Sequence, residues 1–328
     1  MKLRKIITAI FAATVAACLS GCAPTPIKAA PDDSPPQADT RVVGYLPDWS
    51  YYFYGNLDFY ALTHLNIAFC NPDVRGNLSC GIPAAQMKEI VGRAHAAGVK
   101  VMAALGGGGG CDGFLALLDT PAEMEDFNGK IMEYCEQNEL DGIDLDIELD
   151  SSHKIWNYYG DWVVSLRELC DERGYELSTA TAQWVSGKVT ADTYALFDFV
   201  NVMAYDDDSD KNSHSSYECA VKSLEYFNIN RAVEAAKLVL GVPFYGRGYK
   251  NGALDWGSYE SFASLVAADP DNYCSDTYNG IAYNGAETIK DKCELAKGYG
   301  GIMIWEVSLD AVGEYSLLDV IKTEMLGK

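Results

Sequence analysis

Histidine is scarce in this sequence, and the cysteines lack the spacing of a metal site. The 328 residues include four histidines and ten cysteines. No two cysteines form a C-x-x-C pair, and the histidines at positions 64, 95, 153 and 214 do not cluster with them. Zinc sites depend on closely spaced ligand pairs of this kind. The sequence therefore predicts no metal centre.

Basic residues are also few. The chain carries 25 Lys and Arg against 47 Asp and Glu, a formal net charge of −22. Such a chain repels phosphate backbones and anionic lipid surfaces. The composition argues against a nucleic-acid partner and against electrostatic membrane binding. It suits a neutral or cationic ligand.

The chain has no apolar run long enough to span a bilayer. Ile6–Ala17 is the longest run near the N-terminus, and a spanning helix needs about 20 apolar residues. Lys2, Arg4 and Lys5 precede it, as in an export signal. Leu19–Cys22 reads L-S-G-C and resembles a bacterial lipobox, which implies lipidation at Cys22; an ordinary signal peptide is the alternative. We expect residues 1–22 to be this leader.

The segment after the leader predicts how the protein is held. Ala23 follows the cysteine, which resembles outer-membrane lipoproteins of Gram-negative bacteria. Residues 23–40 are rich in proline and have no core-forming pattern, so we expect a tether. The localisation predicted is the cell envelope, with a monomer attached to the membrane through its lipid alone.

Export would permit disulfides, but the sequence does not decide whether they form. Cys70 with Cys80 and Cys274 with Cys293 are plausible pairs. A barrel of this size does not need them. Free thiols are the alternative.

The stretch Asp141–Glu148, D-G-I-D-L-D-I-E, reads as a buried strand. Its aliphatic residues alternate with carboxyls, so on a strand three acids face one way. A packed core does not tolerate unpaired acids, and neighbouring like charges raise at least one pKa. Glu148, nearest the C-terminal end, is the natural proton donor. An edge strand with a solvated face is the alternative.

Residues 41–328 show a repeated strand-then-helix rhythm that predicts one domain with parallel strands. Helical patterns at 85–97, 121–138, 155–173 and 217–236 separate several of the strands. Eight strands in this rhythm indicate a (β/α)8 TIM barrel. The predicted strands are 42–45, 64–69, 100–105, 142–148, 176–182, 197–205, 238–244 and 301–305.

Between the seventh strand and the last helix, 250–287 is short, with a helix expected at 259–268 and a strand at 281–283. We therefore expect a short insertion and an open groove.

Aromatic and polar side chains collect where these strands end, the edge at which barrel enzymes build active sites. This agreement predicts one site. The residues at strand ends are Tyr45, Phe69, Glu148, Gln183, Tyr205, Asp206, Tyr245 and Trp305.

Several of these stretches carry a resemblance that covers nearly all of 41–328. Asp141–Glu148 resembles the D-G-x-D-x-D-x-E signature of glycoside hydrolase family 18, the chitinases and their relatives. Met203–Asp206 is similar to the family's M-x-Y-D motif, and 241–247 and 301–306 to its seventh and eighth strands. Residues 104–107 resemble its S-x-G-G motif, with Ala104 where serine is usual. The missing hydroxyl commonly supports the acids of the fourth strand.

The resemblance implies a retaining, substrate-assisted hydrolysis that needs no metal or organic cofactor. It makes Glu148 the proton donor, Asp146 the holder of the substrate acetamide, Asp144 its charge-sharing neighbour and Tyr205 a donor to the acetamide oxygen. Asp141 is expected to be structural. The implied substrate-binding residues are Tyr45, Phe69, Gly107, Gln183, Met203, Asp206, Tyr245, Arg247 and Trp305.

Three functions compete at this point. The first is a chitinase acting on β-1,4-linked N-acetylglucosamine. The second is an endo-β-N-acetylglucosaminidase cutting the chitobiose core of N-glycans, which the M-A-Y-D stretch resembles less. The third is a glycan-binding lectin, although inactive relatives usually lack the glutamate present here as Glu148.

Overall fold

The computed structural model describes residues 40–111, 113–209 and 213–328. The leader, the lipidation site at Cys22 and the tether up to residue 39 lie outside this range, so they stay predictions. Within the described residues, no helix is both long and apolar enough to cross a membrane.

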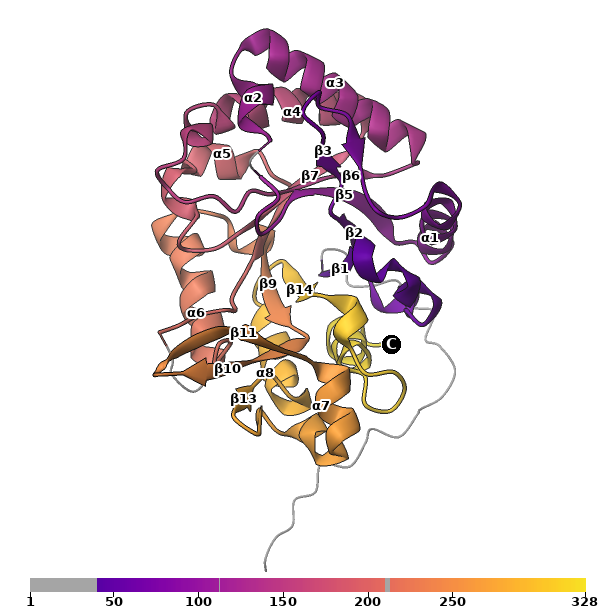
Figure 1. The fold of residues 1–328 in the computed structure, drawn as a ribbon, viewed down its shortest axis with the longest axis vertical. Helices are drawn as coiled ribbons and strands as arrows, with labels where there is room; N and C mark the ends of the chain where they lie inside the picture. Colours follow the sequence, from indigo (N-terminus) through magenta and orange to yellow (C-terminus); the bar gives the residue numbers. More distant parts are fainter. Residues whose placement is uncertain (1–39, 112, 210–212) are drawn as a thin grey trace, which may run out of the picture.

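Eight parallel strands close into a barrel (Figure 1), which confirms the predicted (β/α)8 fold. Their order around the barrel is β1-β14-β9-β8-β7-β6-β5-β2. The bounds are β1 Arg41–Pro47, β2 His64–Ala68, β5 Lys100–Gly106, β6 Gly142–Asp146, β7 Glu176–Thr181, β8 Phe199–Val202, β9 Leu238–Pro243 and β14 Gly301–Trp305.

Helices pack on the outside of this barrel (Figure 1). Their ends follow local signals: Thr120 accepts the Glu123 N–H at the start of α3, and Gly174 ends α4 in the left-handed conformation with φ of 70°. The bounds are α1 Ala84–Ala96, α2 Leu115–Leu118, α3 Pro121–Gln137, α4 Tyr159–Arg173, α5 Ala191–Ala195, α6 Tyr217–Glu225, α7 Phe262–Ala268, α8 Ala286–Ala296 and α9 Leu317–Ile321.

Alternation along β6 divides its side chains between two environments. Ile143 and Leu145 point outward into the core between strands and helices. Asp144 and Asp146 are buried on the other face, toward the barrel interior. The strand ends at Asp146, so Glu148 lies just beyond it rather than within it as expected.

The helix predicted at 217–236 is shorter than expected. The α-helix α6 ends at Glu225, and a π-helical turn follows at Tyr226–Asn230.

The insertion after β9 contains the expected helix, as α7 Phe262–Ala268, and the expected short strand, as β13 Ile281–Ala282, but it has more strands than expected. It is a four-stranded antiparallel sheet in the order β11-β10-β13-β12, packed with α7 (Figure 1). The helix begins at Phe262 rather than at 259 as expected, because residues 253–261 are a strand that pairs with β10 along its length. The bounds are β10 Tyr245–Lys250, β11 Ala253–Ser261, β12 Thr277–Tyr278 and β13 Ile281–Ala282.

Of the two possible disulfides, neither is formed. Cys70, Cys80 and Cys293 are free thiols. Cys70 and Cys80 flank a small hairpin made of β3 (Asn71–Pro72) and β4 (Leu78–Ser79).

A buried lysine holds the loop after β8 against α8. The Lys292 ammonium donates to the Ser215 carbonyl at 2.8 Å, the Ser215 hydroxyl at 2.7 Å and the Asn284 side-chain oxygen at 2.7 Å. Ser215 in turn donates to the Ala204 carbonyl at 2.9 Å, next to Tyr205. Burial lowers the pKa of Lys292 to about 7, but three acceptors match the three donors of an ammonium group.

Replacing this lysine should destabilise the fold. Lys292→Met fills similar space but takes the donor away from two buried acceptors, the Ser215 hydroxyl oxygen and the Asn284 side-chain oxygen. Losses of this kind cost about 1–3 kcal/mol for each buried polar group left unpaired. We expect the free energy of unfolding to fall by about 3 kcal/mol in urea denaturation.

Lys290→Met is the matched control on the same helix. Lys290 pairs with Glu287 on the surface, and exposed pairs contribute at most about 1 kcal/mol. Equal losses in the two variants would show that the buried contacts carry no special weight.

Candidate active site

Asp144 is the deepest acid of β6 and is held by three donors. The Tyr45 hydroxyl donates to it at 2.6 Å, the Ser178 hydroxyl at 2.5 Å and the Asn201 amide at 3.2 Å. Burial raises the pKa of Asp144, while these hydrogen bonds act to lower it. Donors directed at both carboxylate oxygens favour the ionised form.

Asp146 has a different environment on the same face. Burial raises its pKa well above the ordinary value, and the charges of Glu148 and Asp144 add to the rise. Its Oδ1 atom is buried with no hydrogen-bond partner within the described part of the chain. Asp146 is therefore the protonated member of the pair, with one oxygen open to a ligand.

Glu148 lies past the strand end at the mouth of the barrel. Burial raises its pKa to about 7, the charge of Asp206 adds to this, and the Gly108 N–H acts in the opposite direction. A carboxyl with this pKa holds a proton near neutral pH, as a general acid must.

Asp206 follows β8, and two neighbouring side chains stabilise it as a carboxylate. Arg247 donates to both carboxylate oxygens, at 3.1 and 3.0 Å, and the His214 ring lies 3.2 Å from Oδ1. Burial acts to raise the pKa of Asp206, but the hydrogen bonds from His214 and Arg247 outweigh it and lower the pKa. Asp206 is therefore an ionised carboxylate close to Glu148.

The glycines after β5 let main chain pack against the site. Gly106 has φ of 113°, and a Cβ there would lie 2.0 Å from the Asp146 carbonyl oxygen. A Cβ on Gly107, whose φ is 79°, would lie 2.3 Å from the Phe69 ring. Only glycine fits both positions. The resemblance implies that Gly107 binds substrate; in the structure, these two glycines let the main chain approach Asp146 and Phe69.

Trp305, at the end of β14, is enclosed by aromatic side chains. Phe69 stacks on it with ring centroids 5.7 Å apart, and Tyr45 and Trp49 meet it edge-on at 5.5 and 6.5 Å. Trp305 is only partly buried. Its indole is thus fixed by packing and still offers surface to a ligand.

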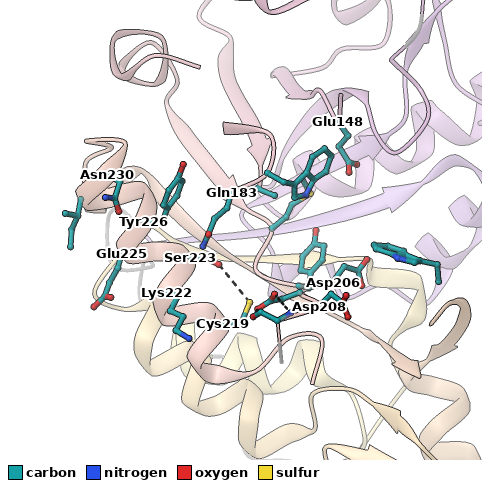
Figure 2. A pocket seen from close by; sticks show the side chains of 18 residues that line it. Glu148, Gln183, Asp206, Asp208, Cys219, Lys222, Ser223, Glu225, Tyr226 and Asn230 are labelled. Atoms are coloured by element: carbon teal, nitrogen blue, oxygen red, sulfur yellow. Dashed lines mark hydrogen bonds between the residues drawn. The ribbon is translucent and has the colours of Figure 1, made fainter. Parts of the chain in front are cut away.

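A pocket of about 920 Å³ opens beside Glu148. Figure 2 shows Glu148 and Asp206 at one end of it and Tyr226 and Asn230 at the other. This volume lies near the top of the range for ligand pockets, about 300–1,000 Å³. The described residues that line it include Gln183, Trp184, Met203, Tyr205, Asp206, Lys222, Tyr226 and Trp256.

The structure brings most of the predicted residues to this region, in two layers. Glu148, Gln183, Met203, Tyr205 and Asp206 line the pocket. Three others expected to bind substrate lie beneath it and have little exposed surface: Tyr45 is 1% exposed, Tyr245 1% and Arg247 9%.

These three have supporting contacts instead. Tyr45 donates to Asp144, Tyr245 packs on Tyr205 and His214, and Arg247 binds Asp206. Asp141 is structural, as expected: it accepts from the Val101 N–H at 2.7 Å and lies 2.8 Å from the His95 ring.

Sequence reasoning missed Ser178, Asn201 and two tryptophans. Trp184 follows β7 and is 56% exposed, and Trp256 of β11 is 66% exposed. Trp256 rests on the Arg247 guanidinium at 5.0 Å, a cation–π contact that leaves its other face open. Position after a strand end was a usable signal for Trp184; no local signal marked the others.

In the described ranges, no group of three or more His, Cys, Asp or Glu side chains could hold a metal ion. The site therefore consists of carboxyls of different pKa, a tyrosine hydroxyl and aromatic surfaces. It can protonate a leaving group and stabilise a neighbouring positive charge.

Known proteins are similar to this chain in sequence and in structure. Residues 41–310 match the family model described as glycosyl hydrolases family 18. Chitinase A1 of Niallia circulans is 28% identical over 284 residues, which cover 65% of this chain and 41% of that protein. The chain thus spans less than half the length of this relative.

Two solved structures are similar along most of the chain. The family 18 chitinase ChiB from the chitin utilization locus of Flavobacterium johnsoniae is 32% identical, with a TM-score of 0.80 over 88% of this chain and 94% of that one. A chitinase from Bacteroides thetaiotaomicron is 25% identical, with a TM-score of 0.78 over 88% and 97%. The sequence motifs, the barrel and these similarities agree: the chain belongs to the glycosyl hydrolases of family 18.

Proposed function

We propose that this protein hydrolyses β-1,4-linked N-acetylglucosamine polymers or oligomers, with the acetamide of the substrate as nucleophile and retention at the anomeric carbon. The observation that carries the proposal is the division of charge along β6. Three donors favour the carboxylate form of Asp144, the buried Oδ1 of Asp146 has no hydrogen-bond partner among the described residues, and Glu148 has a pKa raised to about 7.

Each acid has one step in this reaction. Glu148 gives its proton to the glycosidic oxygen, and the C–O bond to the leaving sugar breaks. The acetamide carbonyl oxygen attacks the anomeric carbon and forms an oxazolinium ion. Asp146 binds the acetamide N–H and stabilises the positive charge. Water, deprotonated by Glu148, then opens the ring with a second inversion, so the net result is retention.

Tyr205 and Asp206 support these steps. Burial raises the pKa of Tyr205 well above its ordinary value, and neighbouring acidic groups, including Asp206, add to the rise, so its hydroxyl stays a donor for the acetamide oxygen. The negative charge of Asp206 raises the pKa of Glu148, so Glu148 stays protonated until it donates its proton to the glycosidic oxygen.

The substrate class is supported by the site and by the relatives together. The proteins of similar sequence and structure include chitinases from bacteria. Trp305 offers an aromatic surface for the sugar at the cleavage point, and the pocket with Trp184 and Trp256 extends from Glu148 on one side. We assign this pocket to the sugars of the leaving group.

Removing the transferable proton should abolish turnover while binding persists. Glu148→Gln keeps the size of the side chain, and general acid catalysis contributes about 100- to 10,000-fold. We expect kcat on chitin oligomers to fall at least about 100-fold, or roughly 2.7 kcal/mol of barrier. Calorimetry should give unchanged affinity for the oligomer.

Glu168→Gln, on the exposed side of α4, is the control and should behave as wild type. A wild type that binds the oligomers and does not cut them would be a lectin. Cleavage confined to an N-glycoprotein, with chitin oligomers untouched, would assign the site to the chitobiose core of glycans.

Participation by the acetamide predicts both the anomer that is released first and a requirement for the N-acetyl group. The first product seen by NMR should be the β-anomer, and fully deacetylated oligomers should resist cleavage, because they lack the nucleophile. Initial release of the α-anomer would exclude this mechanism while leaving a glycosidase.

Ser178 should set the acid limb of the pH profile. Ser178→Ala removes the 2.5 Å donor to Asp144, so the pKa of that carboxyl rises and the acid pair takes up its second proton at higher pH. A hydrogen bond to a charged group is worth about 1.5–3 kcal/mol, so the acid limb of kcat/KM should move up by about one pH unit.

A second substitution tests whether the shift of the acid limb comes from the lost hydrogen-bond donor to Asp144. Ala104 is the register partner of Asp144 on β5, as Ser178 is on β7. Ala104→Ser in the Ser178→Ala protein should return a donor from the opposite side and move the limb back. An acid limb that stays in place in Ser178→Ala would leave Ser178 a packing residue only.

A further inference from the structure

The β3–β4 hairpin beside the site is flanked by two opposed cysteines. Cys70 precedes β3 and Cys80 follows β4. Asn71 pairs with Ser79 in antiparallel register, so Cys70 and Cys80 occupy the next opposed positions. Opposed residues in such a pair have Cα atoms about 4.5–5.5 Å apart, inside the range of about 4.4–6.8 Å for disulfides.

The two side chains already meet. Each sulfur lies 3.5 Å from the Tyr134 hydroxyl, and the sulfurs are within hydrogen-bonding reach of each other. Cys70 is fully buried, whereas Cys80 is only partly buried. Both are free thiols. The Cys80 thiol can therefore react with a reagent from solvent, whereas the Cys70 thiol is shielded from solvent next to it.

We propose that Cys70 and Cys80 form a thiol–disulfide exchange site, in which Cys80 attacks a disulfide donor and Cys70 resolves the intermediate. The Cys80 thiolate bonds to one donor sulfur and expels the other as a thiolate. Cys70 then loses its proton and attacks the Cys80 sulfur, so that the second donor thiol leaves. Two protein thiols are oxidised, and the donor disulfide is reduced to two thiols.

The pKa values of the two thiols assign the same roles as their exposure does, with Cys80 as the attacking thiol and Cys70 as the resolving thiol. The hydrogen bond with Cys70 lowers the pKa of Cys80 to about 6, and the N–H of Ile82 contributes. The same contact, together with burial, raises the pKa of Cys70 well above the ordinary value. Cys80 is thus a thiolate at neutral pH, the form that attacks disulfides.

Closing this bond would fix two loops at the sugar site. The Asn71 side chain accepts from the Gly106 N–H at 2.7 Å and donates to the Gly106 carbonyl at 2.9 Å. At the other end of the hairpin, the Gly81 N–H donates to Asp48 at 2.6 Å. Asp48 precedes Trp49, which contacts Trp305. The bond therefore joins the glycine loop after β5 to the loop after β1.

The test uses the described domain with its leader removed, reduced and then incubated with oxidised glutathione. We expect peptide mapping to find a Cys70–Cys80 disulfide and no glutathione adduct. Short closed loops stabilise proteins by about 3 kcal/mol, so the melting temperature should rise by roughly 5 °C. Iodoacetamide should label Cys80 of the reduced protein at least ten times faster than buried Cys135.

Three variants separate the roles. Cys70→Ala should stop at a stable adduct of one glutathione on Cys80, because nothing resolves it. Cys80→Ser should give neither adduct nor disulfide, and its melting temperature should not respond to glutathione. Cys293→Ser, in a distant helix, should behave as wild type.

The proposal is overturned if Cys80 is labelled as slowly as Cys135, or if oxidised glutathione leaves both thiols reduced in wild type. These readouts need no sugar substrate, so their failure and the failure of the proposed hydrolase are independent.

Discussion

The placement of negative charge inside the barrel is the constraint on which the rest of the site depends. Three carboxyls of the β6 region point toward one interior, and each is accommodated differently. Burial raises the pKa of Asp144, and three donors oppose this and favour its ionised form. Asp146, whose buried Oδ1 has no hydrogen-bond partner in the part of the chain that the structure describes, is protonated because burial and neighbouring charges raise its pKa. Glu148 lies at the mouth with a pKa of about 7. A gradient of proton affinity results from burial, hydrogen bonding and the charges of neighbouring carboxylates.

The need to place negative charge inside the barrel also explains the role of the antiparallel sheet inserted after β9. Asp206 raises the pKa of Glu148 by its charge, which requires that Asp206 itself stays ionised although burial opposes this. Arg247 of β10 supplies the compensating charge, and it also supports Trp256 of β11 through its guanidinium. One arginine thus couples the electrostatics of the acid to the wall of the pocket, so the antiparallel sheet belongs to the site.

The sequence predicted the barrel well because its signal is periodic. Strands alternate, helices follow them, and polar residues gather where strands end, which located Glu148 and Tyr205. Burial could not be predicted in this way: Tyr45 and Tyr245 follow the same rule and yet lie beneath the site. The strand at 253–261 was missed because its pairing with β10 is a tertiary contact that no local pattern marks.

Ala104 shows why a departure from a motif has to be judged in the structure. The family's motif has serine there, so the sequence indicated a lost hydroxyl beside the acids. In a parallel sheet, however, a central strand has two neighbours at each register position. Asp144 lies between Ala104 on β5 and Ser178 on β7, and Ser178 donates the hydrogen bond. The physical requirement is a donor at this carboxylate, and either neighbouring strand can provide it. Whether such a site has its donor can therefore be judged only from the strand pairing, which was not known from the sequence alone.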